Sequence, residues 1–165
     1  MVSKLHKNLK VPVTCKIRCL PDEQRTLELA RAIQDAGASL LTIHGRCKEH
    51  NKHLVGSCNY DIIKKVKQSL DIPVICNGGI SKFEDIQRCL ELTGVDGVMA
   101  CESILEYPAL FDDSKIYDLD ELTLEYIDMF EKYPGEADMK TIRSHMFKFL
   151  YTGLQVHTDL RSKLG

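Results

Sequence analysis

The chain has 165 residues, is 44% hydrophobic and 28% charged, and carries a net charge of −2. This composition is ordinary for a soluble globular chain with enough apolar residues to form a core. No apolar run approaches the ~18 residues of a membrane span, and no apolar signal core follows Met1, so no membrane partner is expected. The seven cysteines are odd in number and form no CxxC pair, which favours reduced thiols in the cytoplasm or the nucleus.

Short β-branched runs alternate with helical patterns over roughly the first 110 residues. A short basic amphipathic helix is expected within residues 1–10. Strands are then expected at 11–17, 40–43, 72–76 and 94–99, and helices at 22–36, 60–70 and 82–92. This βα spacing predicts an α/β fold with a parallel sheet, and near-continuous apolar strands fit burial on both faces. Since no glycine-rich nucleotide turn follows the first strand, the TIM barrel is favoured over the doubly wound fold.

The pattern changes after Phe111, where three further helices are expected at 119–133, 139–150 and about 154–163. The domain boundary is therefore placed at 112/113, with an all-α domain at 113–165. Charge also changes along this part of the chain. Residues 112–138 hold ten acidic and two basic residues, whereas residues 139–165 hold five basic and one acidic. A basic terminus suits an anionic partner, although two solvated helical faces would give the same pattern.

Polar and glycine residues follow each expected strand, at the edge where parallel α/β proteins carry their functional groups. Lys16 closes the first strand and His44 the second, and a lysine and a histidine in one mouth would suit an electron-rich ring or a phosphate. Gly78 and Gly79 follow the third strand, and such a pair lets backbone N–H groups approach an anion closely.

Four motifs in this order resemble those of the tRNA-dihydrouridine synthases. They are PVTCKIR at 12–18, TIHGR at 42–46, PVICNGGI at 73–80, and GVM at 97–99 with YPALF at 107–111. The tail, from Ile142 to Arg161, is similar to the 16/17 type, which is named for the tRNA positions it modifies. The resemblance covers essentially the whole chain.

The resemblance implies the C-terminal half of an FMN-binding TIM (β/α)8 barrel, strands five to eight, over residues 1–112. It implies a helical tRNA-binding domain over 113–165. Members of the family reduce the C5–C6 bond of uridine in the tRNA D-loop with FMN, and NADPH reduces the flavin again. The partner is therefore expected to be tRNA, and the cofactors FMN and NADPH.

The same resemblance assigns roles residue by residue. Lys16 and His44 would contact the flavin ring, and Arg46 would shape the site or meet the nucleic acid. The ribityl-phosphate end of FMN would be lined by Asn77, Gly78, Gly79, Cys101 and Glu102. Many relatives have Gly-Arg at the last two positions, so phosphate here would depend on backbone N–H groups. The tRNA-binding cations would be Lys140, Arg143, Lys148 and Arg161, with Lys163 beside them.

The family's general-acid cysteine lies in a motif that this sequence lacks, so no catalytic residue is assigned. We expect that cysteine in the first barrel half. Four strands do not close a barrel, and the half-barrel alone is expected to be inactive and to self-associate. A zinc site at Cys47, His50, His53 and Cys58 is disfavoured because the spacing lacks a usual zinc motif.

Two other functions remain open. One is a different FMN TIM-barrel oxidoreductase that acts on a small molecule, and the other is a non-catalytic RNA-binding module. The basic C-terminal helices favour tRNA over a small molecule.

Overall fold

The computed structural model describes residues 1–49, 56–135 and 137–165. The chain divides into two compact units, residues 1–100 and 101–165, which are taken in turn below. The division lies between Ala100 and Cys101, before the boundary at 112/113 that the sequence suggests. The turn and short helix between these two points belong to the second unit.

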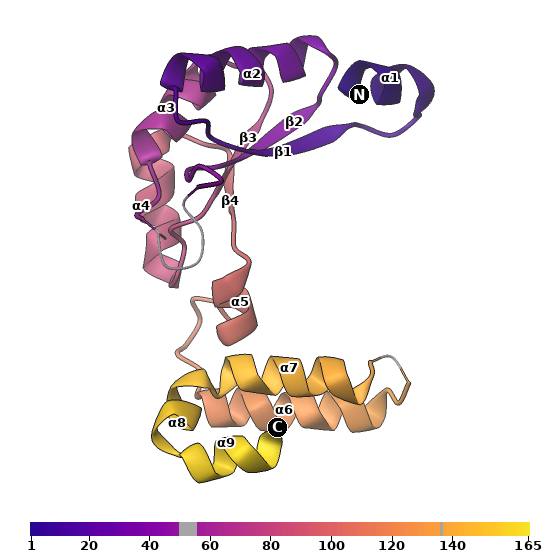
Figure 1. The fold of residues 1–165 in the computed structure, drawn as a ribbon, viewed down its shortest axis with the longest axis vertical. Coiled ribbons are helices and arrows are strands. Elements are labelled where there is room, and N and C mark those ends of the chain that lie inside the picture. Colours follow the sequence, from indigo (N-terminus) through magenta and orange to yellow (C-terminus); the bar gives the residue numbers. More distant parts are fainter. Residues whose placement is uncertain (50–55, 136) are drawn as a thin grey trace. The chain divides into compact units, whose positions relative to one another are not determined.

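The first unit contains a parallel sheet whose strands lie in chain order, β1-β2-β3-β4, within its described residues. The strands are β1 (Thr14–Arg18), β2 (Leu40–His44), β3 (Val74–Asn77) and β4 (Gly97–Met99). The helices are α1 (Val2–Asn8), α2 (Glu23–Asp35), α3 (Tyr60–Gln68) and α4 (Phe83–Thr93). Helices α2, α3 and α4 alternate with the strands and lie beside the sheet (Figure 1). The expected α/β class with a parallel sheet is confirmed.

Side-chain caps fix where the helices of this unit begin. The Asp22 carboxylate accepts a hydrogen bond from the backbone N–H of Arg25 at 2.7 Å, and the Asn59 side chain accepts one from Ile62 at 3.1 Å. These bonds satisfy N–H groups that have no partner within the helix itself. At the other end of α4, Gly94 adopts a left-handed backbone with a φ of 70°, which ends the helix.

The two faces of the sheet differ in burial. On the face toward the helices, the residues of the two central strands are fully buried, namely Leu41, Ile43, Val74 and Cys76. On the other face, Thr14, Lys16, Arg18 and Met99 are exposed. The apolar strands had suggested burial on both faces. Among the described residues, the face without helices is exposed along β1 and at Met99, whereas Thr42 and Asn77 on the same face are buried.

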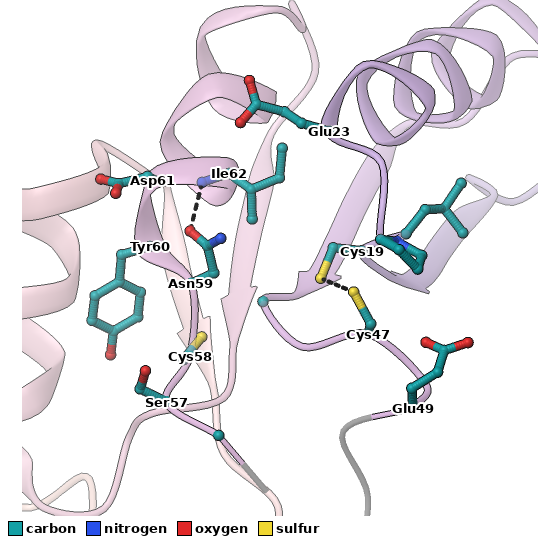
Figure 2. A pocket seen from close by; sticks show the side chains of 14 residues that line it. Cys19, Glu23, Cys47, Glu49, Ser57, Cys58, Asn59, Tyr60, Asp61 and Ile62 are labelled. Atoms are coloured by element: carbon teal, nitrogen blue, oxygen red, sulfur yellow. Dashed lines mark hydrogen bonds between the residues drawn. The ribbon is translucent and has the colours of Figure 1, made fainter. Parts of the chain in front are cut away.

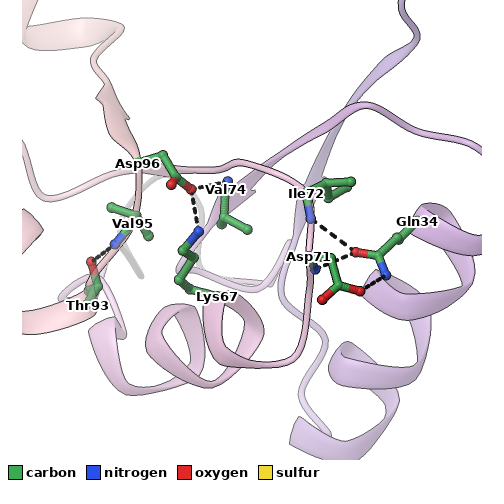
Figure 3. Close-up of polar contacts among 8 residues, drawn as sticks. All are labelled: Gln34, Lys67, Asp71, Ile72, Val74, Thr93, Val95 and Asp96. Atoms are coloured by element: carbon green, nitrogen blue, oxygen red, sulfur yellow. Dashed lines mark hydrogen bonds and ion pairs between the residues drawn. The ribbon is translucent and has the colours of Figure 1, made fainter.

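Polar side chains satisfy backbone groups where β3 begins (Figure 3). The Gln34 side-chain oxygen, from α2, accepts hydrogen bonds from the backbone N–H groups of Asp71 and Ile72 at 2.8 and 3.3 Å. The Asp96 carboxylate accepts one from the N–H of Val74 at 2.7 Å. These bonds hold the amino ends of the strands in place. The expected site lies at the other, carboxyl ends.

The second unit consists of helices within its described residues. These are α5 (Glu102–Glu106), α6 (Leu119–Lys132), α7 (Met139–Phe149), α8 (Tyr151–Val156) and α9 (Thr158–Leu164). Its core is the buried stripe Ile142, Met146 and Phe149 of α7, against which Tyr126 and Phe130 of α6 pack. Within the described parts of the chain, no helix has the length and the apolarity needed to cross a bilayer.

The end of this unit differs from the sequence-based expectation. A single helix was expected at about 154–163, but α8 and α9 are separated at His157, whose φ of −98° and ψ of 72° are not helical. The short helix α5 was not expected. Both differences lie in segments too short for periodicity to define a helix.

We predict that Asp96→Ala lowers the free energy of unfolding by about 1–3 kcal/mol, because it leaves the buried N–H of Val74 without its partner. The hydrogen bonds from the Lys67 ammonium and the Val74 N–H lower the pKa of Asp96. The stabilisation is therefore complete above the unfolded-state pKa of about 4 and is lost as the pH falls through the lower folded-state pKa. Urea unfolding at neutral and acidic pH measures both effects.

The matched control is Glu23→Ala. Glu23 also pairs with a lysine at 2.7 Å, through Lys65, but the side chains of this pair are about half exposed. An exposed pair of this kind contributes only ~0–1 kcal/mol. Equal losses in the two variants would show that the bond to Val74 adds nothing.

Candidate functional site

The strand register brings the predicted site residues to one face of the sheet. Arg18 pairs with His44, and His44 pairs with Asn77, so these three residues form one row at the carboxyl ends of the strands. Lys16 lies two residues before Arg18, in register with Thr42. Residues in register on parallel strands point to the same face, which here is the face that the helices leave uncovered. The structure therefore places Lys16, His44 and Asn77 on one face of the sheet. His44 and Asn77 end their strands, whereas Lys16, expected to close the first strand, is the middle residue of β1.

His44 is half-buried, and its ring nitrogen Nε2 is a buried atom with no hydrogen-bond partner among the described residues. Burial, together with the positive charges of Arg18, Lys16 and Arg46, lowers the pKa of His44 to about 4. The imidazole is therefore neutral at pH 7. A neutral imidazole in a cationic setting can exchange a hydrogen bond with a polar or electron-rich group.

Glycines after β3 allow the backbone to approach this histidine closely. Gly78 has a φ of 95°, and a Cβ atom there would lie 2.8 Å from the His44 ring. Gly79 has a φ of 78°, and a Cβ atom there would lie 2.5 Å from the Tyr60 hydroxyl. That hydroxyl donates a hydrogen bond to the Gly79 carbonyl at 3.1 Å. Both positions therefore require glycine, for conformation and for space.

Asn77 and Arg46 each form a hydrogen bond to a backbone carbonyl, in addition to the roles predicted for them. The Asn77 amide nitrogen donates to the Met99 carbonyl at 2.8 Å, and its side chain is buried. This bond ties the ends of β3 and β4 together. The Arg46 Nε donates to the Gly56 carbonyl at 2.7 Å and holds the loop after β2. The predicted cofactor role of Asn77 and the predicted substrate role of Arg46 stay predictions.

Two residues of the site were not singled out in the sequence. Arg18 lies in register with His44, and its Nη1 donates to the Cys47 carbonyl at 3.1 Å. The two-residue alternation from Lys16 could have indicated Arg18. Tyr60 comes from the start of α3, and its position beside Gly79 has no local signal in the sequence.

A hollow lies between the loop after β1 and the loop after β2, and two thiols meet there (Figure 2). The sulfur atoms of Cys19 and Cys47 are 3.5 Å apart. Burial and the hydrogen bond with Cys47 raise the pKa of Cys19 to about 12, so this thiol stays neutral.

No metal-binding group of histidine, cysteine and carboxylate side chains occurs among the described residues. Of the disfavoured zinc ligands, His50 and His53 lie outside the described residues. Cys101 and Glu102 belong to the second unit, and their cofactor role stays a prediction. Cys101 is exposed, and the Glu102 carboxylate lies 3.5 Å from the Lys148 ammonium.

Four of the five predicted RNA-binding cations, Lys140, Arg143, Lys148 and Arg161, line one groove of the second unit, and Lys163 is not part of its lining. A groove of about 510 Å³, called here the basic groove, is formed by α7, α8 and α9. Its lining includes Lys140, Arg143, Phe147, Lys148, Tyr151 and Arg161. On the other side of α7, the buried residues Ile142, Met146 and Phe149 form the core stripe that the sequence predicted. The amphipathic pattern of α7 is thus confirmed.

Comparison with known proteins gives one matching family. The model of the dihydrouridine synthase family matches residues 1–163. A mouse protein named tRNA-dihydrouridine(16/17) synthase-like is 40% identical over all of this chain and 34% of its own length. The Schizosaccharomyces pombe tRNA-dihydrouridine(16/17) synthase is 38% identical over all of this chain and 44% of its own length. The chain thus spans between a third and a half of these relatives.

Among solved structures, a mandelate oxidase with benzoyl-formic acid is similar over 79% of this chain and 49% of that chain. The sequence identity is 19% and the TM-score is 0.43. A likeness this low does not bear on function.

We predict that Cys19 resists alkylation in the folded protein, because a thiol with a pKa of about 12 forms almost no nucleophilic thiolate at pH 8. The exposed Cys101 provides the comparison within the same sample. Mass spectrometry after treatment with iodoacetamide should find Cys101 modified and Cys19 free, and unfolding in urea should remove the difference. Equal modification in the folded protein would contradict the buried thiol pair.

Proposed function

Since the chain belongs to the dihydrouridine synthase family, we propose that it forms part of a flavin-dependent tRNA-dihydrouridine synthase of the 16/17 type. The observation that carries the proposal is the neutral, half-buried His44, whose Nε2 lacks a partner among the described residues. Three cations that act on its pKa surround it, and the family match extends over both units.

The residues at the strand ends fit an FMN cofactor on two grounds. The Nε2 atom of His44 is left for a hydrogen bond with a polar edge of a ring. Gly78 and Gly79, packed against His44 and Tyr60, follow β3 without side chains of their own, so their backbone groups could approach a ribityl or phosphate group. Bound FMN would supply the hydride that reduces the C5–C6 bond of uridine, and NADPH would supply hydride to FMN.

The side chains of this chain would bind and polarise the cofactor. His44, neutral at pH 7, would exchange a hydrogen bond with the ring without adding charge. Lys16 and Arg18 would stabilise negative charge on the ring, because both lie on the same face of the sheet. No residue of the chain is assigned as the proton donor to the uracil ring.

We further propose that this sheet is the second half of a TIM barrel. In support, the strands are parallel and in chain order. Among the residues that the structure describes, β1 and β4 each pair on one side only, and the face that carries Lys16 and Arg18 has no covering helix. Barrel closure takes about eight strands, so further strands would cover that face and both edges. Exposed edges and apolar groups such as Met99 would otherwise favour association between copies.

The proposal is tested with the full-length protein, purified and supplied with FMN, NADPH and tRNA that lacks dihydrouridine. Mass spectrometry of the tRNA should detect the two-hydrogen mass gain in the D-loop. His44→Ala should weaken FMN binding by roughly tenfold in a fluorescence titration, since one buried hydrogen bond contributes about 1–3 kcal/mol. Formation of dihydrouridine should fall with it.

His6→Ala is the matched control. The His6 ring packs on Gly37, before β2 begins and so at the opposite end of that strand from His44. FMN affinity should be unchanged in this variant. Absence of dihydrouridine with the unaltered protein would refute the enzymatic proposal, whereas equal FMN affinity in the His44 variant would remove only His44 from the site.

The basic groove is proposed to bind tRNA phosphates. Arg143→Glu combined with Lys148→Glu should weaken tRNA binding at least tenfold at moderate salt, because phosphate contacts release counterions. The dependence on salt should also become shallower by about one to two units of log K against log salt. Fluorescence anisotropy with labelled tRNA measures both quantities.

A second charge reversal serves as the control for this change. Lys64→Glu with Arg88→Glu alters one lysine and one arginine that are exposed on α3 and α4 of the first unit. It should change affinity much less. If both double variants bind tRNA as tightly as the unaltered protein, the basic groove is not part of the interface.

A further inference from the structure

The basic groove combines cations with an apolar floor. Phe147, Tyr151 and Leu154 line it together with the cationic side chains. The Tyr151 side chain is 56% exposed, whereas Leu154 is buried. Phosphate binding requires only cations and hydrogen-bond donors. It does not explain an exposed aromatic ring among the cations.

The cations of the groove come from different helices. Arg143 comes from α7 and Arg161 from α9, while Tyr151 begins α8 between them in the chain. All three line the same groove. Lys148 contacts Glu102 only as a partly exposed ion pair at 3.5 Å, a kind of pair that an incoming phosphate can replace.

The size of the groove also restricts its occupant. Its volume of about 510 Å³ lies within the ~300–1,000 Å³ of pockets that hold one small organic molecule. Bases in a duplex are stacked and paired, so a duplex presents phosphates but no free base face. An unpaired nucleotide presents both a ring face and flanking phosphates.

We infer that the basic groove binds one unpaired nucleotide of the RNA, with its base against Tyr151 and Phe147 and its flanking phosphates on Arg143 and Arg161. The hydroxyl of Ser144 and the amide of Gln155, which also line the groove, offer hydrogen bonds to the base edge. The inference rests on the proposed function and specifies what the second unit recognises. Recognition then requires a looped-out or single-stranded base, in addition to the charge of the backbone.

The test compares two single strands of about ten nucleotides, a length within the ~4–16 that single-strand binding sites cover. One is oligouridine, and the other is an abasic strand with the same phosphates and no bases. Tyr151→Leu should weaken oligouridine binding by roughly 5- to 100-fold, since base stacking on an aromatic ring contributes ~1–3 kcal/mol. It should leave binding of the abasic strand within about twofold, which also shows that the variant is folded.

The control is Tyr151→Phe, which keeps the ring and removes the hydroxyl, and should bind oligouridine as the unaltered protein does. Fluorescence anisotropy in the protein as its gene encodes it measures all of these affinities. If the unaltered protein binds both strands equally, or if the leucine variant loses nothing, the groove binds backbone only and the inference is overturned. The proposed function would survive that result, because it fails only when the unaltered protein forms no dihydrouridine in tRNA.

Discussion

The register of the parallel sheet determines where every functional group of the first unit points. Cys15, Leu41 and Val74 share one row on the helix side, while Lys16 and Thr42 share the next row on the open side. A slip of one residue between neighbouring strands would exchange these faces and bury the lysine in the core. The hydrophobic contacts with α2, α3 and α4 therefore stabilise the fold and also fix the chemistry of the open face.

In the second unit, one face of α7 forms the core and another face lines the basic groove. In α7, the stripe of Ile142 and Met146 forms the core, and Arg143, one position on from Ile142, faces the basic groove. The ring of Tyr126 lies edge-on to the ring of Phe149, and its hydroxyl bonds to His145 Nδ1 at 2.7 Å. These contacts hold the helix in one rotation about its axis, and the rotation decides which side chains line the groove.

Periodicity was enough to predict the elements that are long and repeat clearly. The strands and the helices α2, α3, α4, α6 and α7 lie within a few residues of their expected positions. The short helix α5 and the break at His157 could not be predicted, because each involves too few residues to form a pattern. An apolar strand has the same sequence whether or not its covering partner belongs to the same chain, so the expectation of an exposed sheet face came from the half-barrel resemblance and not from the strand pattern.

Within the candidate site, strand ends were predictable and contacts between loops were not. His44 follows from the rule that parallel strands carry function at their carboxyl ends, whereas Lys16 lies in the middle of β1, which ends two residues later at Arg18. The hydrogen bond from Asn77 to Met99 and the approach of Tyr60 to Gly79 depend on how neighbouring βα units pack. Cys19 and Cys47 come from two different loops, and no sequence spacing predicts that their thiols lie together.

The chain-order arrangement of the strands has a consequence for how the first unit acquires its structure. Each strand pairs only with the one before and the one after it in the sequence, so the loops that must close are short and cost little entropy. Assembly can then advance one βα unit at a time, as in a repeat protein, with each new unit docking on the last. Such a sheet can be extended at β1 or at β4 without breaking any pair already formed.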